Sequence, residues 1–163
     1  MRARFQVQSL VSYYISHADT LTFDIPHSDP VAITVHNTHR YQLTPSAAEE
    51  FAALLPLGGH LVHLGSPPRV HTPTLFHEMK CLGIIQAALI GIHDDASATP
   101  TPLVSHCLGY LRQRILCRPN LRLESVTNAN ASSEKEYGTV CRNWEGVYAA
   151  AERNQAAFAA LYG

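Results

Sequence analysis

Two sets of polar side chains recur at helical spacing in the second half of the chain. His77, Lys80 and Cys81 lie at positions i, i+3 and i+4, so a helix would bring them to one face. Imidazole is the usual acid or base near neutral pH and the commonest metal ligand, and an amine or a phenol can polarise a carbonyl. The second set consists of His106, Tyr110, Gln113 and Cys117, which also stand at helical spacing. Together the two sets predict a site for proton transfer or metal binding.

The other histidines near predicted turns have no partner at a spacing that favours a shared site. A single histidine is more often a surface or packing residue than a ligand, and we expect structural roles for these four. The interval between His60 and His63 suits a metal site poorly, because residues three apart in a strand point to opposite faces. The four are His60, His63, His71 and His93.

Two helices must position the polar sets. Apolar residues spaced by three and four predict a helix from Thr74 to Ile92 and another from about Leu103 to Cys117. The linker between them is short, so we expect the helices to pack as neighbours with both polar sets lining one cleft. The residues expected to face the core are Leu75, Met79, Leu82, Ile85 and Leu89 on the first helix, and Val104, Leu108, Leu111 and Ile115 on the second.

The remaining elements predict an α+β fold. Strands are expected at residues 31–35 and 61–64, with one short helix from Thr44 to about Leu55 between them. The stretch from Glu124 to Glu136 is expected to be an exposed loop. We therefore predict a single domain over residues 1–163, with a small β-rich N-terminal half and a helical half of about three helices. A C-terminal helix is marked by Trp144, Val147, Tyr148, Ala151, Phe158 and Leu161.

Composition narrows the classes of protein and partner. The chain has 163 residues, of which 46% are hydrophobic and 15% charged, as expected for one domain with a single core. The net charge is −1 when the histidines are neutral, so no broad polyanion-binding surface is implied. We therefore expect no nucleic acid partner.

Four cysteines allow two disulfides. Cys107 and Cys117 lie ten residues apart on one predicted helix, about 15 Å along its axis, and cannot bond to each other. Cys81 would then pair with either of them, and Cys141 with the other. The alternative is four free, buried thiols.

The cysteine count and a glycosylation sequon, Asn130-Ala131-Ser132, favour the lumen of the secretory pathway as the location, with the cytoplasm as the alternative. We expect neither a leader nor an anchor segment in the sequence.

Residues 75–82, which read LFHEMKCL, resemble the first HxxHC motif of the UstYa-type fungal proteins. Residues 105–113, which read SHCLGYLRQ, resemble the second motif when taken together with Cys117. Flanking segments at residues 54–65 and 141–144 also resemble that family. The resemblance covers roughly residues 31 to 155, and its order and spacing follow the family pattern.

The resemblance implies a tailoring enzyme of fungal secondary metabolism that cyclises or oxidatively remodels a preformed scaffold, commonly with copper. The substrate would be a small-molecule or peptide biosynthetic intermediate, and a homodimer or a heterodimer with a paralogue is expected. His77 and His106 stand at motif histidines and would be the copper ligands. Cys81 and Cys107 stand at the motif cysteines.

Three family histidines are replaced in this chain. Lys80 and Leu103 stand at motif histidines, and Val140 stands just before the late cysteine. A protonated lysine repels a copper ion and leucine offers no lone pair, so His77 and His106 alone should hold copper weakly. Water, a second subunit or another histidine, such as His60 or His71, would have to complete the shell.

Three hypotheses follow. In the first, His77 and His106 still bind copper, and the protein performs an oxidative ring closure or desaturation. In the second, the cleft is a metal-free cyclase or isomerase in which His77 or His106 moves the proton, Lys80 or Tyr110 polarises a carbonyl, and apolar walls fold the substrate, with Gln113 as a further candidate residue. In the third, the chain is a catalytically silent partner of an intact paralogue.

Overall fold

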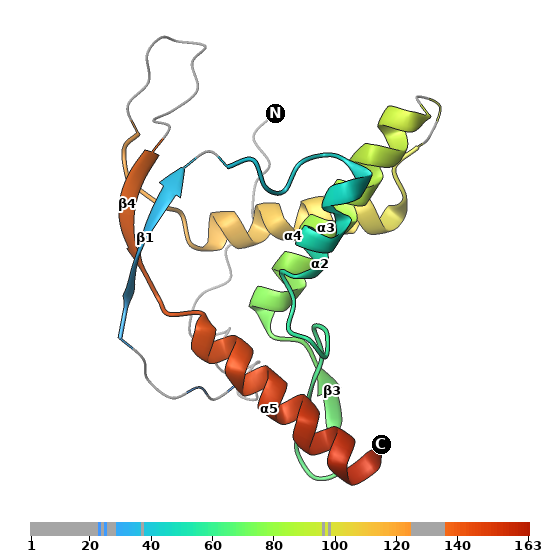
Figure 1. Cartoon of the computed structure of the whole chain (residues 1–163), viewed down its shortest axis with the longest axis vertical. Helices are drawn as coiled ribbons and strands as arrows, with labels where there is room; N and C mark the ends of the chain where they lie inside the picture. Colours follow the sequence, from blue (N-terminus) through green and yellow to red (C-terminus); the bar gives the residue numbers. More distant parts are fainter. Residues whose placement is uncertain are drawn as a thin grey trace, which may run out of the picture.

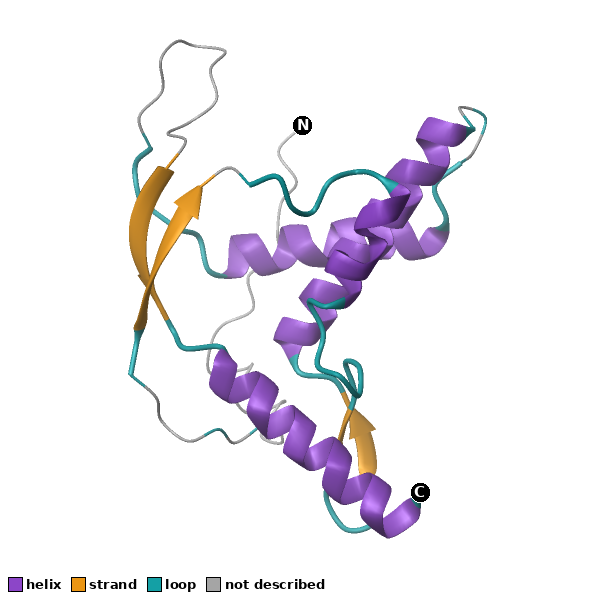
Figure 2. Ribbon diagram, viewed as in Figure 1, coloured by secondary structure: helices purple, strands orange, loops and turns teal. Residues whose placement is uncertain are grey.

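The computed structural model describes residues 23, 25, 29–36, 38–95, 97, 99–124 and 136–163. Figure 2 shows helices and short strands together, which confirms the predicted α+β class. The predicted sequon at residues 130–132 lies outside the described residues. The elements in chain order are β1 (Val31–His36), η1 (Pro45–Ala47), α2 (Ala48–Ala52), β2 (Val62–Leu64), β3 (Arg69–His71), α3 (Thr74–Asp94), α4 (Pro102–Cys117), β4 (Glu136–Cys141) and α5 (Glu145–Tyr162).

The β1 and β4 strands form an antiparallel ribbon, which lies at the left of the view in Figure 1. Val31 stands opposite Cys141, and His36 stands opposite Glu136. The sequence analysis predicted β1 but assigned no strand after the loop that it placed at residues 124–136. Strand β4 was missed because its hydrogen-bonding partner lies about a hundred residues earlier in the chain.

The second sheet is the β2–β3 hairpin, in which Val62 pairs with His71 and Leu64 pairs with Arg69. Gly65 begins the turn with a φ of 89°, a backbone conformation that favours glycine. Strand β2 was predicted from the sequence, whereas β3 is too short to show a periodic signal.

The helical half follows the predicted boundaries closely. Helix α3 begins at Thr74 as predicted and continues to Asp94. Helix α4 begins at Pro102, and the side chain of Thr101 caps it by accepting a hydrogen bond from the Val104 amide at 3.4 Å. The predicted short helix from Thr44 divides into η1 and α2.

The apolar core lies where β2, the start of α3 and α5 meet. Val62, Phe76 and Ala151 are buried there, and the rings of Phe76 and Tyr148 meet edge to face at 5.0 Å. The Tyr148 hydroxyl donates a hydrogen bond to the Leu54 carbonyl oxygen at 2.7 Å, which ties α5 to the segment after α2.

The predicted core faces of α3 and α4 are wrong in part. Leu82 and Leu89 are 39% and 44% exposed, and Leu108 and Ile115 are 55% and 69% exposed. The buried residues of α3 are instead Phe76, Cys81 and Gln86. On α4 the prediction of a buried Val104 is confirmed, and Cys107 is buried with it. The two helices pack through the side that carries the motif residues, so part of each apolar stripe faces outward.

By length and composition alone, α3 could cross a membrane. The helix has 21 residues, and 17% of its most apolar stretch of 18 residues is buried. Helix α3 nevertheless packs against α2 and α4, and its first half carries His77, Glu78 and Lys80. We therefore describe it as a helix of the folded unit.

The predicted disulfides are not formed, and all four cysteines are free thiols. Cys81 and Cys107 are buried between α3 and α4, where their thiols share a hydrogen bond. Cys117 is exposed at the end of α4 and Cys141 lies half-buried on β4, so the alternative of four buried thiols is also wrong.

Candidate active site

The packing of α3 on α4 brings together the two motif histidines, which lie 29 positions apart in the chain. The Nε2 atoms of His77 and His106 are 3.4 Å apart, and the two ring planes are inclined by 18°. In a hydrogen bond of this kind one imidazole donates its proton and the other accepts it. The structure thus joins two groups that can exchange a proton.

Tyr110 completes a stack of three rings. Its ring lies 4.0 Å from the His77 ring, with 24° between the planes. Burial raises the pKa of the Tyr110 hydroxyl above its ordinary value, and a side-chain hydrogen bond with Thr74 and the charge of Arg114 oppose this shift. The phenol is therefore protonated at neutral pH and can donate a hydrogen bond.

An ion pair joins the two helices beside the histidines. The Nε atom of Arg114 donates to a carboxylate oxygen of Glu78 at 2.8 Å. This hydrogen bond is the main reason that the pKa of Arg114 is raised. The sequence analysis missed the pair, because residues 36 apart on separate helices show no joint periodicity.

The Cys81 thiol is protonated at neutral pH. Burial raises its pKa to about 12, and the hydrogen bond with Cys107 adds to this shift. A protonated thiol is a poor nucleophile and a poor metal ligand, because both roles need the thiolate. In this structure Cys81 therefore joins α3 to α4 by packing.

Two further basic residues, Lys80 and His60, lie near His77. Burial lowers the pKa of His60, and the charges of Lys80 and His77 lower it further. His60 is half-buried and Lys80 is exposed, and neither is hydrogen-bonded to a carboxylate in the described part of the chain. The structure thus adds His60, which the sequence analysis considered as a structural residue or as a further copper ligand, to the surroundings of the site.

Gln113 does not join the cluster. Its amide donates a hydrogen bond to the Gly109 carbonyl oxygen of its own helix at 3.1 Å. It lies two helical turns beyond His106, about 10 Å along the axis. The hydrogen bond that the structure gives to the Gln113 side chain is thus to its own helix and not to the three stacked rings.

His71, which was considered as a further metal ligand, lies on β3. Its Nε2 atom is buried without a hydrogen-bond partner.

The histidine pair supplies two metal donors. When two nitrogens bind the same metal ion at about 2 Å with a tetrahedral angle between them, they lie about 3.3 Å apart. The 3.4 Å distance between the Nε2 atoms of His77 and His106 is close to this value. Among the residues that the structure describes, however, no three histidine, cysteine or acidic side chains converge on one point. The donor set therefore does not fit a complete copper shell.

Comparison with known proteins adds a family match. The model of the family described as mycotoxin biosynthesis protein UstYa matches residues 65–152, which is more than half of the chain and includes both motif segments. No curated protein and no solved structure matches the chain significantly.

Proposed function

Because the chain belongs to the UstYa family of mycotoxin biosynthesis proteins, we propose that it is an enzyme that remodels a preformed biosynthetic intermediate by proton transfer. Membership of that family implies a role in fungal secondary-metabolite biosynthesis. The observation that supports proton transfer is the 3.4 Å contact between the Nε2 atoms of His77 and His106.

The proposed chemistry is a redox-neutral cyclisation or isomerisation. The imidazole that donates in the pair takes a proton at its Nδ1 atom from the carbon beside a carbonyl group and passes its Nε2 proton to the Nε2 atom of its partner. The partner then releases its Nδ1 proton elsewhere on the intermediate, so both imidazoles stay neutral overall. Tyr110, protonated and stacked on His77, donates a hydrogen bond to the carbonyl oxygen as negative charge develops there. Proton transfer by a positioned side chain contributes roughly 10²- to 10⁴-fold to the rate.

Copper-dependent oxidation is the second candidate, favoured by the spacing of the two imidazole nitrogens. His77 and His106 would then be ligands, and a group outside the described residues would complete the shell. Bound copper would supply two successive one-electron oxidations, which together remove two hydrogen atoms from the intermediate, with dioxygen as the final electron acceptor.

The two candidates differ in the mass of the product. Deletion of the gene in the source organism should cause the substrate to accumulate, and mass spectrometry of extracts identifies it. A product with the same mass as the accumulated compound supports the proton-transfer proposal. A product lighter by two hydrogen atoms overturns it in favour of oxidation, and retention of copper by the purified protein would agree with that result.

Complementation separates an enzyme from a silent partner. The deletion strain receives the unchanged gene or a variant with His77→Gln or His106→Gln, and His93→Gln serves as the control because His93 is an exposed residue of the same helix. We expect the control to restore the product and the two motif variants to fail. Full restoration by both motif variants would overturn the catalytic proposal and favour the silent partner.

A further inference from the structure

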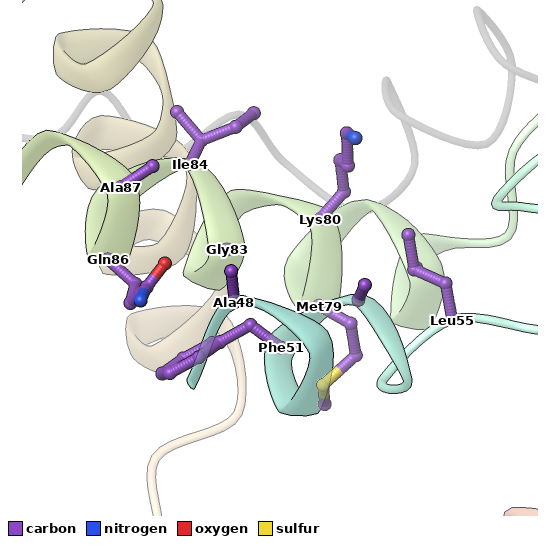
Figure 3. A pocket seen from close by; sticks show the side chains of 10 residues that line it. Ala48, Phe51, Leu55, Met79, Lys80, Gly83, Ile84, Gln86 and Ala87 are labelled. Atoms are coloured by element: carbon purple, nitrogen blue, oxygen red, sulfur yellow. The ribbon is translucent and has the colours of Figure 1, made fainter. Parts of the chain in front are cut away.

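A groove of about 300 Å³ lies between α2 and α3, and one of its lining residues is Lys80, which stands one helical turn from His77 in the sequence. Its walls are mainly apolar and include Phe51, Leu55, Met79 and Ile84. Gly83 also lines it, and a Cβ atom added there would meet only the Phe51 Cβ atom, at 4.0 Å. Figure 3 shows Phe51 and Met79 on the α2 side, whereas Lys80 and Ile84 project together from α3.

The groove is bordered by positive charge. Lys80 is an exposed lining residue of the groove, and its ammonium group points away from Phe51 and Met79, at the edge of the lining. His60 lies close enough to both Lys80 and His77 for its charge to interact with theirs, and His77 is one helical turn from Lys80 in the sequence. No acidic side chain is among the described residues that line the groove, and the Glu78 carboxylate is bound by Arg114.

An apolar groove with a cation at its rim selects one class of small molecule. Apolar walls favour burial of a hydrocarbon arm, and an ammonium group that pairs with no described carboxylate favours an anion. A cationic ligand would be repelled by Lys80. The site is also smaller than most pockets for drug-sized ligands, so it suits one arm of a molecule.

We propose that the substrate is a carboxylic acid with an apolar arm, whose carboxylate binds Lys80 while the arm lies in the groove between α2 and α3. The inference rests on the proposed function, since it names the substrate class of the same site. Lys80 and His77 lie one helical turn apart, about 5 Å along the axis, so a carboxylate bound by Lys80 would place the substrate close to the candidate site.

Three probes with the same eight-carbon arm test the proposal: octanoate, octan-1-ol and octylammonium. Each is titrated into the full chain labelled with ¹⁵N, and the backbone amide signals report where it binds. We expect octanoate to shift the signals of Gly83 and Ile84 and to bind about tenfold more tightly than octylammonium. Equal affinity for the two ions, or shifts confined to residues away from the groove, would overturn the proposal.

Variants separate the charge from the groove. Lys80→Met should weaken octanoate binding about tenfold and leave octan-1-ol unaffected, whereas Arg153→Met removes a positive charge from α5 and should change neither. Gly83→Leu should fill the groove and weaken binding of both probes, and Gly83→Ala is its control because an added Cβ makes only an ordinary contact. Unchanged octanoate affinity in Lys80→Met would contradict the assigned role of Lys80.

The binding test and the test of function can fail separately. His77→Gln should retain the preference for octanoate, because the imidazole does not hold the carboxylate. If octanoate binds as expected while His77→Gln restores the product fully, the proton-transfer proposal fails and the substrate class stands. If the product is lost in His77→Gln while octanoate shows no preference, the substrate class fails and the catalytic proposal stands.

Discussion

Two histidines stack on aromatic rings in different regions of the molecule. In the α3–α4 region the His77 ring lies 4.0 Å from the Tyr110 ring. In the β2–α5 region the His63 ring lies 3.5 Å from the Phe158 ring, with only 5° between the planes. The closer and more parallel stack therefore belongs to the region without the motif residues.

The surroundings of the two rings differ more than the stacks do. The Nε2 atom of His77 meets a second imidazole, whereas the Nδ1 atom of His63 is buried with no hydrogen-bond partner. The backbone of His63 is held on both sides by Asn154, which accepts from its amide and donates to its carbonyl oxygen, each at 2.7 Å. The groups that face the ring nitrogens, and not the stacking, distinguish a candidate catalytic histidine from a structural one.

The largest expected effect separates the two histidines by activity. His77→Gln should lower the rate of conversion of the accumulated intermediate by roughly 10²- to 10⁴-fold, because a proton-transfer group is lost. His63→Gln should leave that rate within about threefold, since His63 belongs to the β2–α5 junction. Rates measured with purified variants check both, and equal losses in the two variants would remove the distinction.

The next effect concerns stability in the β2–α5 region. Asn154→Ala leaves two part-buried backbone groups of His63 without partners and should lower the free energy of unfolding by about 2–4 kcal/mol. Asn154→Asp keeps the acceptor and should cost less. Urea denaturation measures both, and an Asn154→Ala variant as stable as the unchanged protein would show that this junction is not held by the Asn154 side chain.

A pH-dependent effect is expected in the α3–α4 region. The folded state raises the pKa of Cys81 to about 12, so its contribution to stability is complete below the ordinary pKa of a thiol and is lost as the pH rises toward 12. One such group changes the free energy of unfolding by at most about 1.4 kcal/mol per pH unit. Urea denaturation between pH 8 and pH 10 should therefore show a steeper loss in the unchanged protein than in Cys81→Ala, and identical slopes would contradict the assignment.

The smallest effect concerns the ion pair beside the histidines. Glu78→Gln removes the charge that Arg114 binds and should lower the free energy of unfolding by only about 0.5–1 kcal/mol, because both side chains are partly exposed to solvent. The matched control is Glu152→Gln on α5. Thermal unfolding of the two variants checks this, and a loss of several kcal/mol would mean that the pair behaves as a buried one.

The pattern of neighbouring residues was sufficient to predict most of the helix boundaries in the helical half. The start of α3 at Thr74 and the end of α4 at Cys117 follow from spacing, capping and proline signals in neighbouring residues. The grouping of His77 with His106 was predicted in the same way, since a short linker makes the helices neighbours. His60 and the pair of Glu78 with Arg114 could not be found like this, because they meet only across elements.

The sequence by itself determined the helices, the α+β class, the family and the placement of His77, Lys80 and Cys81 along one helix face. The tertiary structure decided which faces are buried, the contact between the two imidazoles and the pairing of β1 with β4. Both sides of α3 carry apolar residues, so periodicity alone could not choose between the face with Leu82 and the face with Cys81. That choice depends on the sum of contacts that α3 makes with α2 and α4, which the spacing of apolar residues within α3 does not reveal.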